Sequence, residues 1–207
     1  MLYTIERDFL GYSDGDLNSA AFRALLCMSF FQDMDWVRSF YDPASEQGRC
    51  FYEATSSSDI REHAETMAIP VGAIRPVIEV RPTAAGRVEL GEPVDKADRR
   101  EAGDTTAWIA RLALTELADA DLLSRFSAIP ARPGGPWERA YVDRDIDEVF
   151  AVFRAPDRHV VETGVGPLGM RLLDLREMRE VLPQDITGPG GAEVAPIARS
   201  SMAGVSG

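Results

Sequence analysis

The sequence predicts an α+β protein in which one small βαββαβ unit occurs twice. Two observations predict this fold class. Over residues 1–81, strand-like alternation and helix-like spacing of apolar residues follow one another in that order. A shift of 101 residues then superposes much of the second part of the chain on this first unit without a gap.

Local patterns define the elements of the first unit. Residues 2–9 alternate as in a strand, and a turn cluster follows in which Asp16 can cap the next helix. Apolar residues at three- and four-residue spacing predict that helix, and a serine-rich cluster caps a second one. The expected strands are residues 2–9, 36–41, 49–54 and 77–81, and the expected helices are 17–32 and 60–67. This order is the split arrangement of ferredoxin-like domains.

The remainder of the chain divides by composition. Residues 82–104 are rich in Pro, Ala, Gly and charge, which predicts a linker with a short strand at 87–90. Residues 105–186 form the second, degenerate unit, whose start, 105–126, has helix-like spacing. Residues 187–207 are rich in Gly, Ala, Ser and Pro with little to bury, so we expect a disordered tail.

The repeat carries the architectural prediction. The 101-residue shift aligns identical residues at seven positions of the first unit, namely Trp36, Arg38, Asp42, Ala54, Arg75, Glu79 and Val80. A four-stranded sheet with two helices on one face leaves its other face uncovered. We therefore expect tandem ferredoxin-like units that pack sheet to sheet as a pseudo-dimeric α/β barrel within one chain. Further homodimerisation stays open.

Composition limits the function. The formal charge of −12 disfavours nonspecific binding to nucleic acid or an anionic membrane. Cys27 and Cys50 are too few for a disulfide framework. Charges at Glu6 and Arg7 argue against a signal peptide, and the longest apolar stretch, 20–31, is too short to span a bilayer. We expect a cytoplasmic protein.

Polar candidates for a site cluster in the first unit. His63, one of two histidines, follows a strand that carries Cys50, Tyr52 and Glu53. A thiol, an imidazole and oxygen donors suit a borderline transition metal, although the spacing matches no standard zinc motif. The shift replaces these four by Gly164, Ala151, Phe153 and Arg154. Either the first unit keeps a functional site and the second serves structure only, or function never constrained these positions in either unit.

Other motifs indicate no chemistry. The string from Gly164 to Gly169 fits Gly-x-Gly-x-x-Gly, but Pro167 and the absence of a parallel βαβ unit favour a helix-to-strand turn. His159 and Glu162 suit a solvated pair. No Ser-His-Asp order, phosphate-binding loop or paired acid/base motif is evident, so an enzymatic role stays open.

The first unit also resembles a known family. The segments Glu6–Asp8, Trp36–Phe40, Arg49–Ala54, Ile60–Ala64 and Ile69–Ile74 are similar to those of small bacterial ferredoxin-like proteins that include a nickel-binding, nickel-responsive member. The resemblance covers residues 1–81. It implies a ferredoxin-like fold, pairing of two sheets, and nickel as cofactor near His63 and Cys50. Phe40 stands where a tyrosine is common in the family, which removes one oxygen donor.

Three functions are compatible with these observations. The leading hypothesis is a metal-binding or metal-responsive protein, with nickel held by His63, Cys50 and Glu53. The alternative is a small-molecule binder or enzyme that uses the cavity between the two sheets, where Arg38, Tyr52, His63 and Arg154 would line an anionic site. The third is a non-catalytic interaction module that recruits a partner through its acidic surface or its tail.

Overall fold

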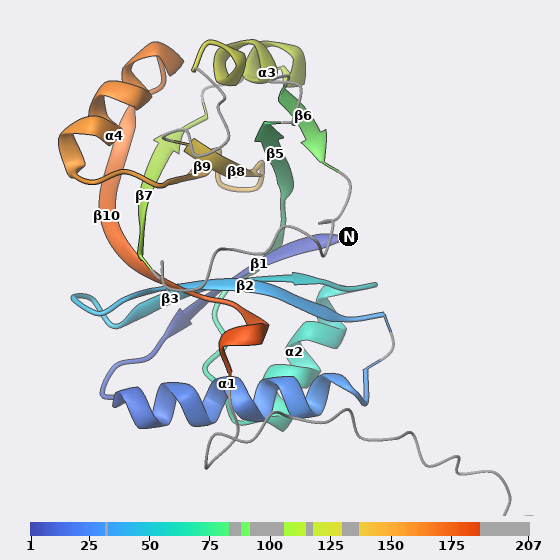
Figure 1. Ribbon diagram of the computed structural model, residues 1–207. Coiled ribbons are helices and arrows are strands. Elements are labelled where there is room, and N and C mark those ends of the chain that lie inside the picture. Colours follow the sequence, from blue (N-terminus) through green and yellow to red (C-terminus); the bar gives the residue numbers. More distant parts are fainter. Residues whose placement is uncertain (32, 83–87, 92–105, 115–117, 130–136, 187–207) are drawn as a thin grey trace, which may run out of the picture.

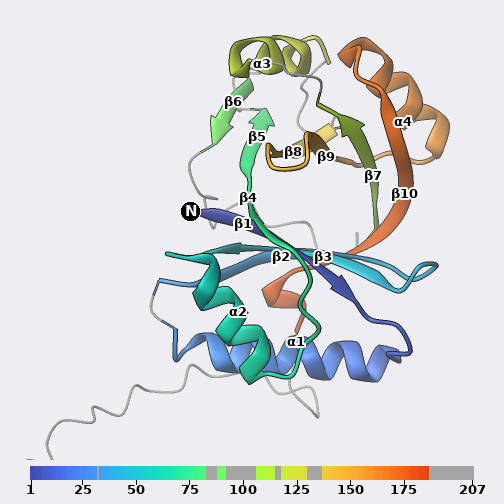
Figure 2. The same cartoon turned by 180° about the vertical axis from the view of Figure 1, so that it is seen from behind.

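A computed structural model describes residues 1–31, 33–82, 88–91, 106–114, 118–129 and 137–186. One curled antiparallel sheet of ten strands runs through it, with helices on the outer sides (Figures 1 and 2). The predicted α+β class is confirmed. Most of the predicted linker and the whole of the predicted tail, 187–207, lie outside the described residues. None of the helices described is both long and apolar enough to cross a membrane.

The first half has the predicted order for its first five elements, but the predicted fourth strand at 77–81 is corrected. Residues 74–76 pair with the first strand of the same half, whereas residues 78–82 pair with the second half. The two helices of the first half begin at capping boxes, in which Ser13 pairs with Asp16 and Ser56 with Asp59. The elements are β1 (Leu2–Asp8), α1 (Asp14–Met28), β2 (Asp35–Asp42), β3 (Gln47–Glu53), α2 (Ser57–Thr66), β4 (Ile74–Pro76) and β5 (Ile78–Pro82).

The second half corrects one expectation. The predicted helix over 105–126 is wrong at its start, because residues 106–113 form a strand and the helix begins only at Asp119. This strand lies between two others and is covered on both faces, which removes the alternation that marks a half-buried strand. The elements are β6 (Val88–Gly91), β7 (Thr106–Ala113), α3 (Asp119–Ser127), β8 (Trp137–Asp143), β9 (Glu148–Phe153), α4 (Arg158–Val165) and β10 (Leu172–Val181), with 3-10 turns at Gly166–Leu168 and Pro183–Asp185.

The strand order is the same in both halves. The sheet runs β4-β1-β3-β2-β10-β7-β9-β8-β5-β6. In the second half the single long strand β10 pairs with β7 of its own half and then with β2 of the other, where Val181 pairs with Ser39. In the first half these two pairings belong to separate strands, because β4 pairs with β1, whereas β5 pairs with β8 through Val80 and Ala140. Positions 80 and 181, like 39 and 140, are 101 apart, which is the offset found in the sequence. A duplicated origin stays a prediction.

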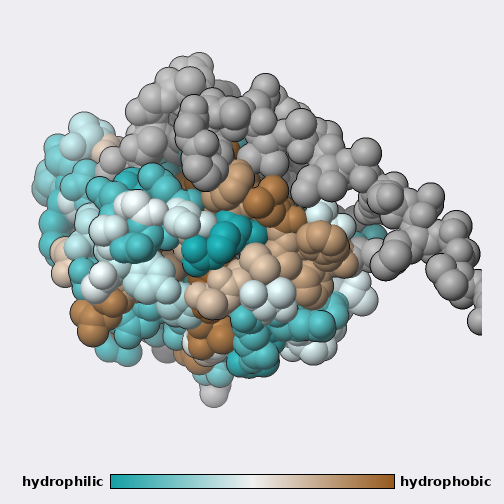
Figure 3. Space-filling view, turned by 90° about the horizontal axis from the view of Figure 1, so that it is seen from below, coloured by the Kyte–Doolittle hydropathy of each residue, from teal (hydrophilic) through white to brown (hydrophobic). Residues whose placement is uncertain are grey.

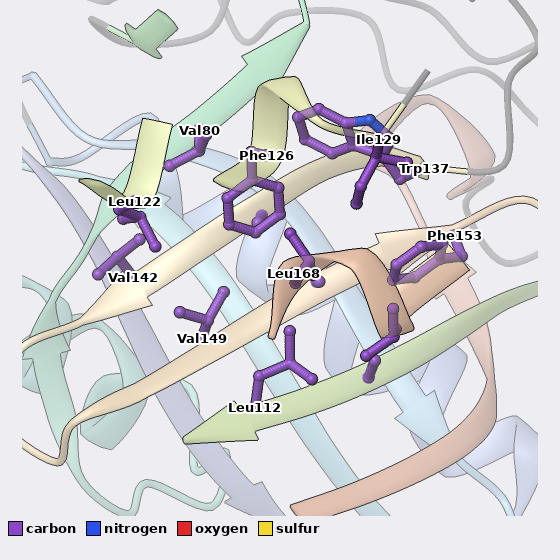
Figure 4. Close-up of a cluster of buried hydrophobic side chains, with 14 of the residues drawn as sticks. Val80, Leu112, Leu122, Phe126, Ile129, Trp137, Val142, Val149, Phe153 and Leu168 are labelled. Atoms are coloured by element: carbon purple, nitrogen blue, oxygen red, sulfur yellow. The ribbon is translucent and has the colours of Figure 1, made fainter. Parts of the chain in front are cut away.

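The halves pack sheet to sheet with their helices outside (Figures 1 and 2). An apolar layer occupies part of the space between the two halves of the sheet, where the Phe51 and Tyr141 rings stack at 3.8 Å between centroids. A second apolar cluster lies under α3 and α4 (Figure 4). On the opposite side of the molecule, which Figure 3 shows from below, apolar surface lies beside polar surface. Phe30, just after α1, is 78% exposed.

Several ion pairs of the described residues join the halves, and four of them use the charged residues that recur at the 101-residue offset. Two of these four pairs are almost fully buried, and in the other two the arginine is partly exposed. They are Arg38–Glu180 (2.7 Å), Arg139–Glu79 (2.9 Å), Arg75–Asp143 (2.7 Å) and Arg176–Asp42 (2.7 Å). Exchanging the halves converts each pair into another. The charged matches in the sequence are therefore contacts between the halves.

Candidate functional site

The helix-facing side of the first half holds a polar cluster inside an apolar layer. Side chains alternate along a strand, so Cys50 and Tyr52 of β3 and Arg7 of β1 face α1 and α2. His63 of α2 lies against them, and its ring centroid is 6.0 Å from that of Tyr52. All four side chains are buried. Three of the predicted site residues are thus brought to one side of the sheet.

His63 is held in a defined tautomer. Its Nε2 lies 2.9 Å from the carbonyl oxygen of Ala24, and because that oxygen can only accept, Nε2 carries the proton. Nδ1 of the neutral ring therefore presents a lone pair, and it is buried without a hydrogen-bond partner. Burial lowers the pKa of His63, and the nearby Arg7 charge lowers it further. The neutral imidazole can therefore donate its Nδ1 lone pair to a metal ion.

Arg7 connects the thiol to the rest of the site. Its Nε donates to Cys50 Sγ at 3.2 Å, and its Nη1 donates to the Pro70 carbonyl at 2.5 Å. Burial opposes the Arg7 charge, but interactions with Cys50 and Tyr52 leave its pKa raised. Burial also raises the pKa of Tyr52 to about 12, so its hydroxyl stays protonated at neutral pH.

The other predicted residues lie elsewhere. Glu53 follows Phe51 on the opposite face of β3, toward the space between the halves. Arg38 is ion-paired with Glu180 and Glu138. Across the part of the chain that the structure describes, no three His, Cys, Asp or Glu side chains are grouped so as to hold a metal. The predicted trio is therefore not assembled as a ready-made metal centre.

The alignment of the two halves at the 101-residue offset did not identify Arg7 as a site residue. Arg7 pairs with Gly48 in β1–β3, and Leu112 pairs with Val149 in β7–β9, so these two residues hold equivalent strand positions. The first strand of the second half could not be aligned by sequence, which hid this exchange. The available signal was a charge within the apolar face of residues 2–9. At the equivalent positions the second half carries Leu112, Ala151, Phe153 and Gly164, the first three of them in its apolar core (Figure 4).

Two cavities adjoin these residues. One, of about 70 Å³, lies between α1 and the first-half sheet and is lined by Arg7, Cys50 and Tyr52 among others. The other, of about 440 Å³, lies between the halves and is lined by polar residues of both, including Arg49, Arg111 and Asp174. The first half therefore offers one small pocket and one side of a larger shared cavity.

Two minor motifs stand apart from this site. The glycine string ends α4, passes through the 3-10 turn with Pro167 and reaches β10, so it is a helix-to-strand connection. His159 is exposed, and Glu162 pairs with Arg158 rather than with His159. Neither contributes to the buried cluster.

Residues 3–77 match the family described as nickel responsive protein, SCO4226-like. This match supports the resemblance stated for the first unit and covers His63, Cys50, Tyr52 and Arg7. No curated protein matches the chain. The chain is thus similar to the nickel-responsive family over its first half.

Several solved structures are similar to the whole chain at low identity. A protein provisionally assigned as a monooxygenase from Lactobacillus acidophilus is 12% identical, with a TM-score of 0.43, over 88% of this chain and 93% of its own. A protein provisionally assigned as a chlorite dismutase is 13% identical, with a TM-score of 0.48, over 89% and 97%. An anthrone oxidase-like protein is 11% identical, with a TM-score of 0.41, over 87% and 91%.

The residues fit a nickel ion in part. A histidine that ligates a metal commonly donates its other ring N–H to a carbonyl, as His63 does to Ala24. Cys50 adds a soft donor on the same side of the sheet. Against this, the Arg7 guanidinium contacts the thiol. Among the described residues, His63 and Cys50 are the two donors that fit.

Proposed function

We propose that this protein is a nickel-responsive binding protein whose site lies in the first half, with His63 as the principal ligand and Cys50 as the second. The observation that carries the proposal is the buried Nδ1 lone pair of His63, fixed by the Nε2 hydrogen bond to Ala24. A buried polar atom without a partner calls for an explanation, and a bound cation supplies one. The match of residues 3–77 to a nickel-responsive family supports the choice of ion.

The residues of the site have separate roles in this proposal. Burial keeps His63 neutral, which a metal ligand requires. Arg7 donates to Cys50 Sγ and fixes the position of this side chain on the helix-facing side of the sheet. Bound nickel would act as a Lewis acid toward both donors. Glu53, on the other face of β3, is the weakest of the predicted ligands.

We also propose that residues 105–186 are a degenerate copy of residues 1–81. Four of the ion pairs between the halves support this, since each of the four has a counterpart at the 101-residue offset. The second half keeps these contacts and carries apolar residues at the site. In this account it closes the sheet and binds no ion.

A nickel titration tests the proposed site. The full chain is treated with EDTA, dialysed, and titrated calorimetrically with NiCl₂. We expect one site per chain, and we expect His63→Ala to weaken binding on the order of a hundredfold or more, because even loss of an outer-shell partner costs up to that much. The exposed His159 provides a matched control, His159→Ala, which should bind as the wild type does.

The cysteines allow the same comparison. Cys50→Ser should weaken nickel binding, whereas Cys27→Ser, at the other buried cysteine, should not. The proposal is wrong if His63→Ala binds nickel as tightly as His159→Ala, or if the wild type binds none at micromolar concentrations.

A second candidate function is small-molecule binding in the cavity between the halves. Its volume of about 440 Å³ falls within the usual range of ligand pockets. The lining differs from the predicted one, because Tyr52 and His63 face the helices while Arg38 and Arg154 are engaged with Glu180. Gln47→Trp, at the rim, should abolish ligand-induced thermal shifts in a screen of polar metabolites, while Arg61→Trp on the outer face of α2 should not.

A further inference from the structure

Arg7 is a buried cation that lacks a carboxylate partner. Three described arginines are fully buried, and two of them, Arg38 and Arg139, are ion-paired with glutamates. Arg7, which is 3% exposed, pairs with no carboxylate among the described residues. Its partners are neutral groups, namely the Cys50 thiol, the Pro70 carbonyl and the Tyr52 hydroxyl. Its Nη2 is buried without a hydrogen-bond partner. Leaving a buried charge uncompensated is costly, so this arrangement indicates a missing anion.

The pocket that Arg7 lines has the matching chemistry. Its walls are mainly apolar, with Phe9, Ala20 and Ile69 among them, and its second charged residue is also an arginine, Arg179. No Asp or Glu lines it. Arg179 also pairs with the exposed Asp14 at 3.4 Å, whereas Arg7 has no such partner among the described residues. In a chain of formal charge −12, a pocket lined by two guanidinium groups and by no carboxylate is suited to a negative ligand.

We infer that this pocket binds a small carboxylate, whose anionic group pairs with Arg7 and whose short apolar part lies against α1. A guanidinium presents two parallel N–H donors that match a carboxylate, and Nη2 is available for one of them. The volume of about 70 Å³ limits the size of the ligand. An engineered apolar cavity of ~150 Å³ holds benzene, so acids of about the size of acetate to butyrate fit here.

The second half shows which residue the fold accepts at the strand position equivalent to Arg7. Leu112, at the strand position equivalent to Arg7, is fully buried in an apolar core. The fold therefore does not need a cation there. A residue that serves structure alone should lower stability when it is replaced, whereas a residue kept for a ligand should not.

Ligand-observed NMR of the EDTA-treated full chain tests this inference. Butyrate is compared with the neutral amide butyramide at constant ionic strength. We expect at least about a tenfold preference for butyrate, as a charge-assisted hydrogen bond provides. Arg7→Met should abolish the preference, and Arg7→Lys should restore part of it. Arg49→Met, at an arginine that lines the other cavity and pairs with Glu6, is the matched control and should keep it.

Two further measurements guard against a folding artefact. The thermal midpoint of Arg7→Met should equal or exceed that of the wild type. Ala20→Leu, which narrows the pocket and leaves Arg7 intact, should also lose butyrate binding. Equal binding of butyrate and butyramide by the wild type, or a preference that persists in both Arg7→Met and Ala20→Leu, would overturn the inference.

The pocket adjoins the proposed nickel site through Cys50 and Tyr52, but the inference does not depend on nickel. Carboxylate binding is measured in metal-free protein, and nickel binding is titrated separately on the same preparation. A butyrate preference without nickel binding rejects the proposed function alone. Nickel binding without a butyrate preference rejects this inference alone.

Discussion

Replacing Glu180 by glutamine should destabilise the protein by about 3 kcal/mol. Glu180 belongs to a cluster between the halves in which three arginines face three glutamates, and its side chain is fully buried. Glutamine keeps the shape but leaves one positive charge in excess. Removing one partner of a buried pair costs about 3–5 kcal/mol, and Glu138, which still contacts Arg38 and Arg154, should keep the loss at the low end.

Urea denaturation followed by tryptophan fluorescence measures this loss in the free energy of unfolding. In a separate thermal melt the midpoint should fall by about 6–12 °C, given about 2–4 °C per kcal/mol for a chain of this size. Glu162→Gln, which breaks the exposed pair with Arg158, should cost less than about 0.5 kcal/mol. The double variant R38M/E180L should recover most of the stability lost, since the charge imbalance is removed. If E180Q is as stable as E162Q, the charges between the halves do not hold them together.

Three further predictions concern the first half. The pKa of His63 is lowered in the folded state, so stability from the neutral ring is present above pH ~6.5 and is lost as the pH falls below that value. The urea midpoint should therefore fall less between pH 7.5 and 5.5 in His63→Gln than in the wild type, and equal falls would contradict the assignment. A Cβ at Gly48 would lie 2.6 Å from the Phe9 ring, so Gly48→Ala should cost about 1–3 kcal/mol. At Gly15 of α1 the nearest atom is 3.6 Å away, and Gly15→Ala should instead stabilise by about 0.5–1 kcal/mol in the same denaturation assay.

The sequence predicts the first half better than the second for a physical reason. Strands β1 to β3, like β7, are covered on both faces, but polar residues such as Thr4 and Glu6 of β1 keep a readable alternation. In β7 both faces are mainly apolar, and Ala107 to Ala113 therefore read as a helix. Local pattern cannot distinguish a buried strand from a buried helix without knowledge of what covers it.

The site shows a similar division. His63, Cys50 and Tyr52 could be proposed from residue chemistry and from their loss at the 101-residue offset. Arg7 could not, because its equivalence to Leu112 depends on strand pairing rather than on alignment. The match of Arg38 with Arg139 was visible in the sequence. The sequence does not show that each arginine pairs with a glutamate of the other half, because these contacts join residues more than 50 positions apart.

Elemental analysis tests the central claim most directly, namely that the first half alone holds a site and that His63 is its principal ligand. The full chain is expressed with nickel in the medium and purified without chelator or immobilised metal, as wild type, His63→Ala and His159→Ala. The account predicts about one nickel ion per chain in the wild type and in His159→Ala, and a small fraction of that in His63→Ala. No bound nickel in the wild type, or equal nickel in all three proteins, would contradict it.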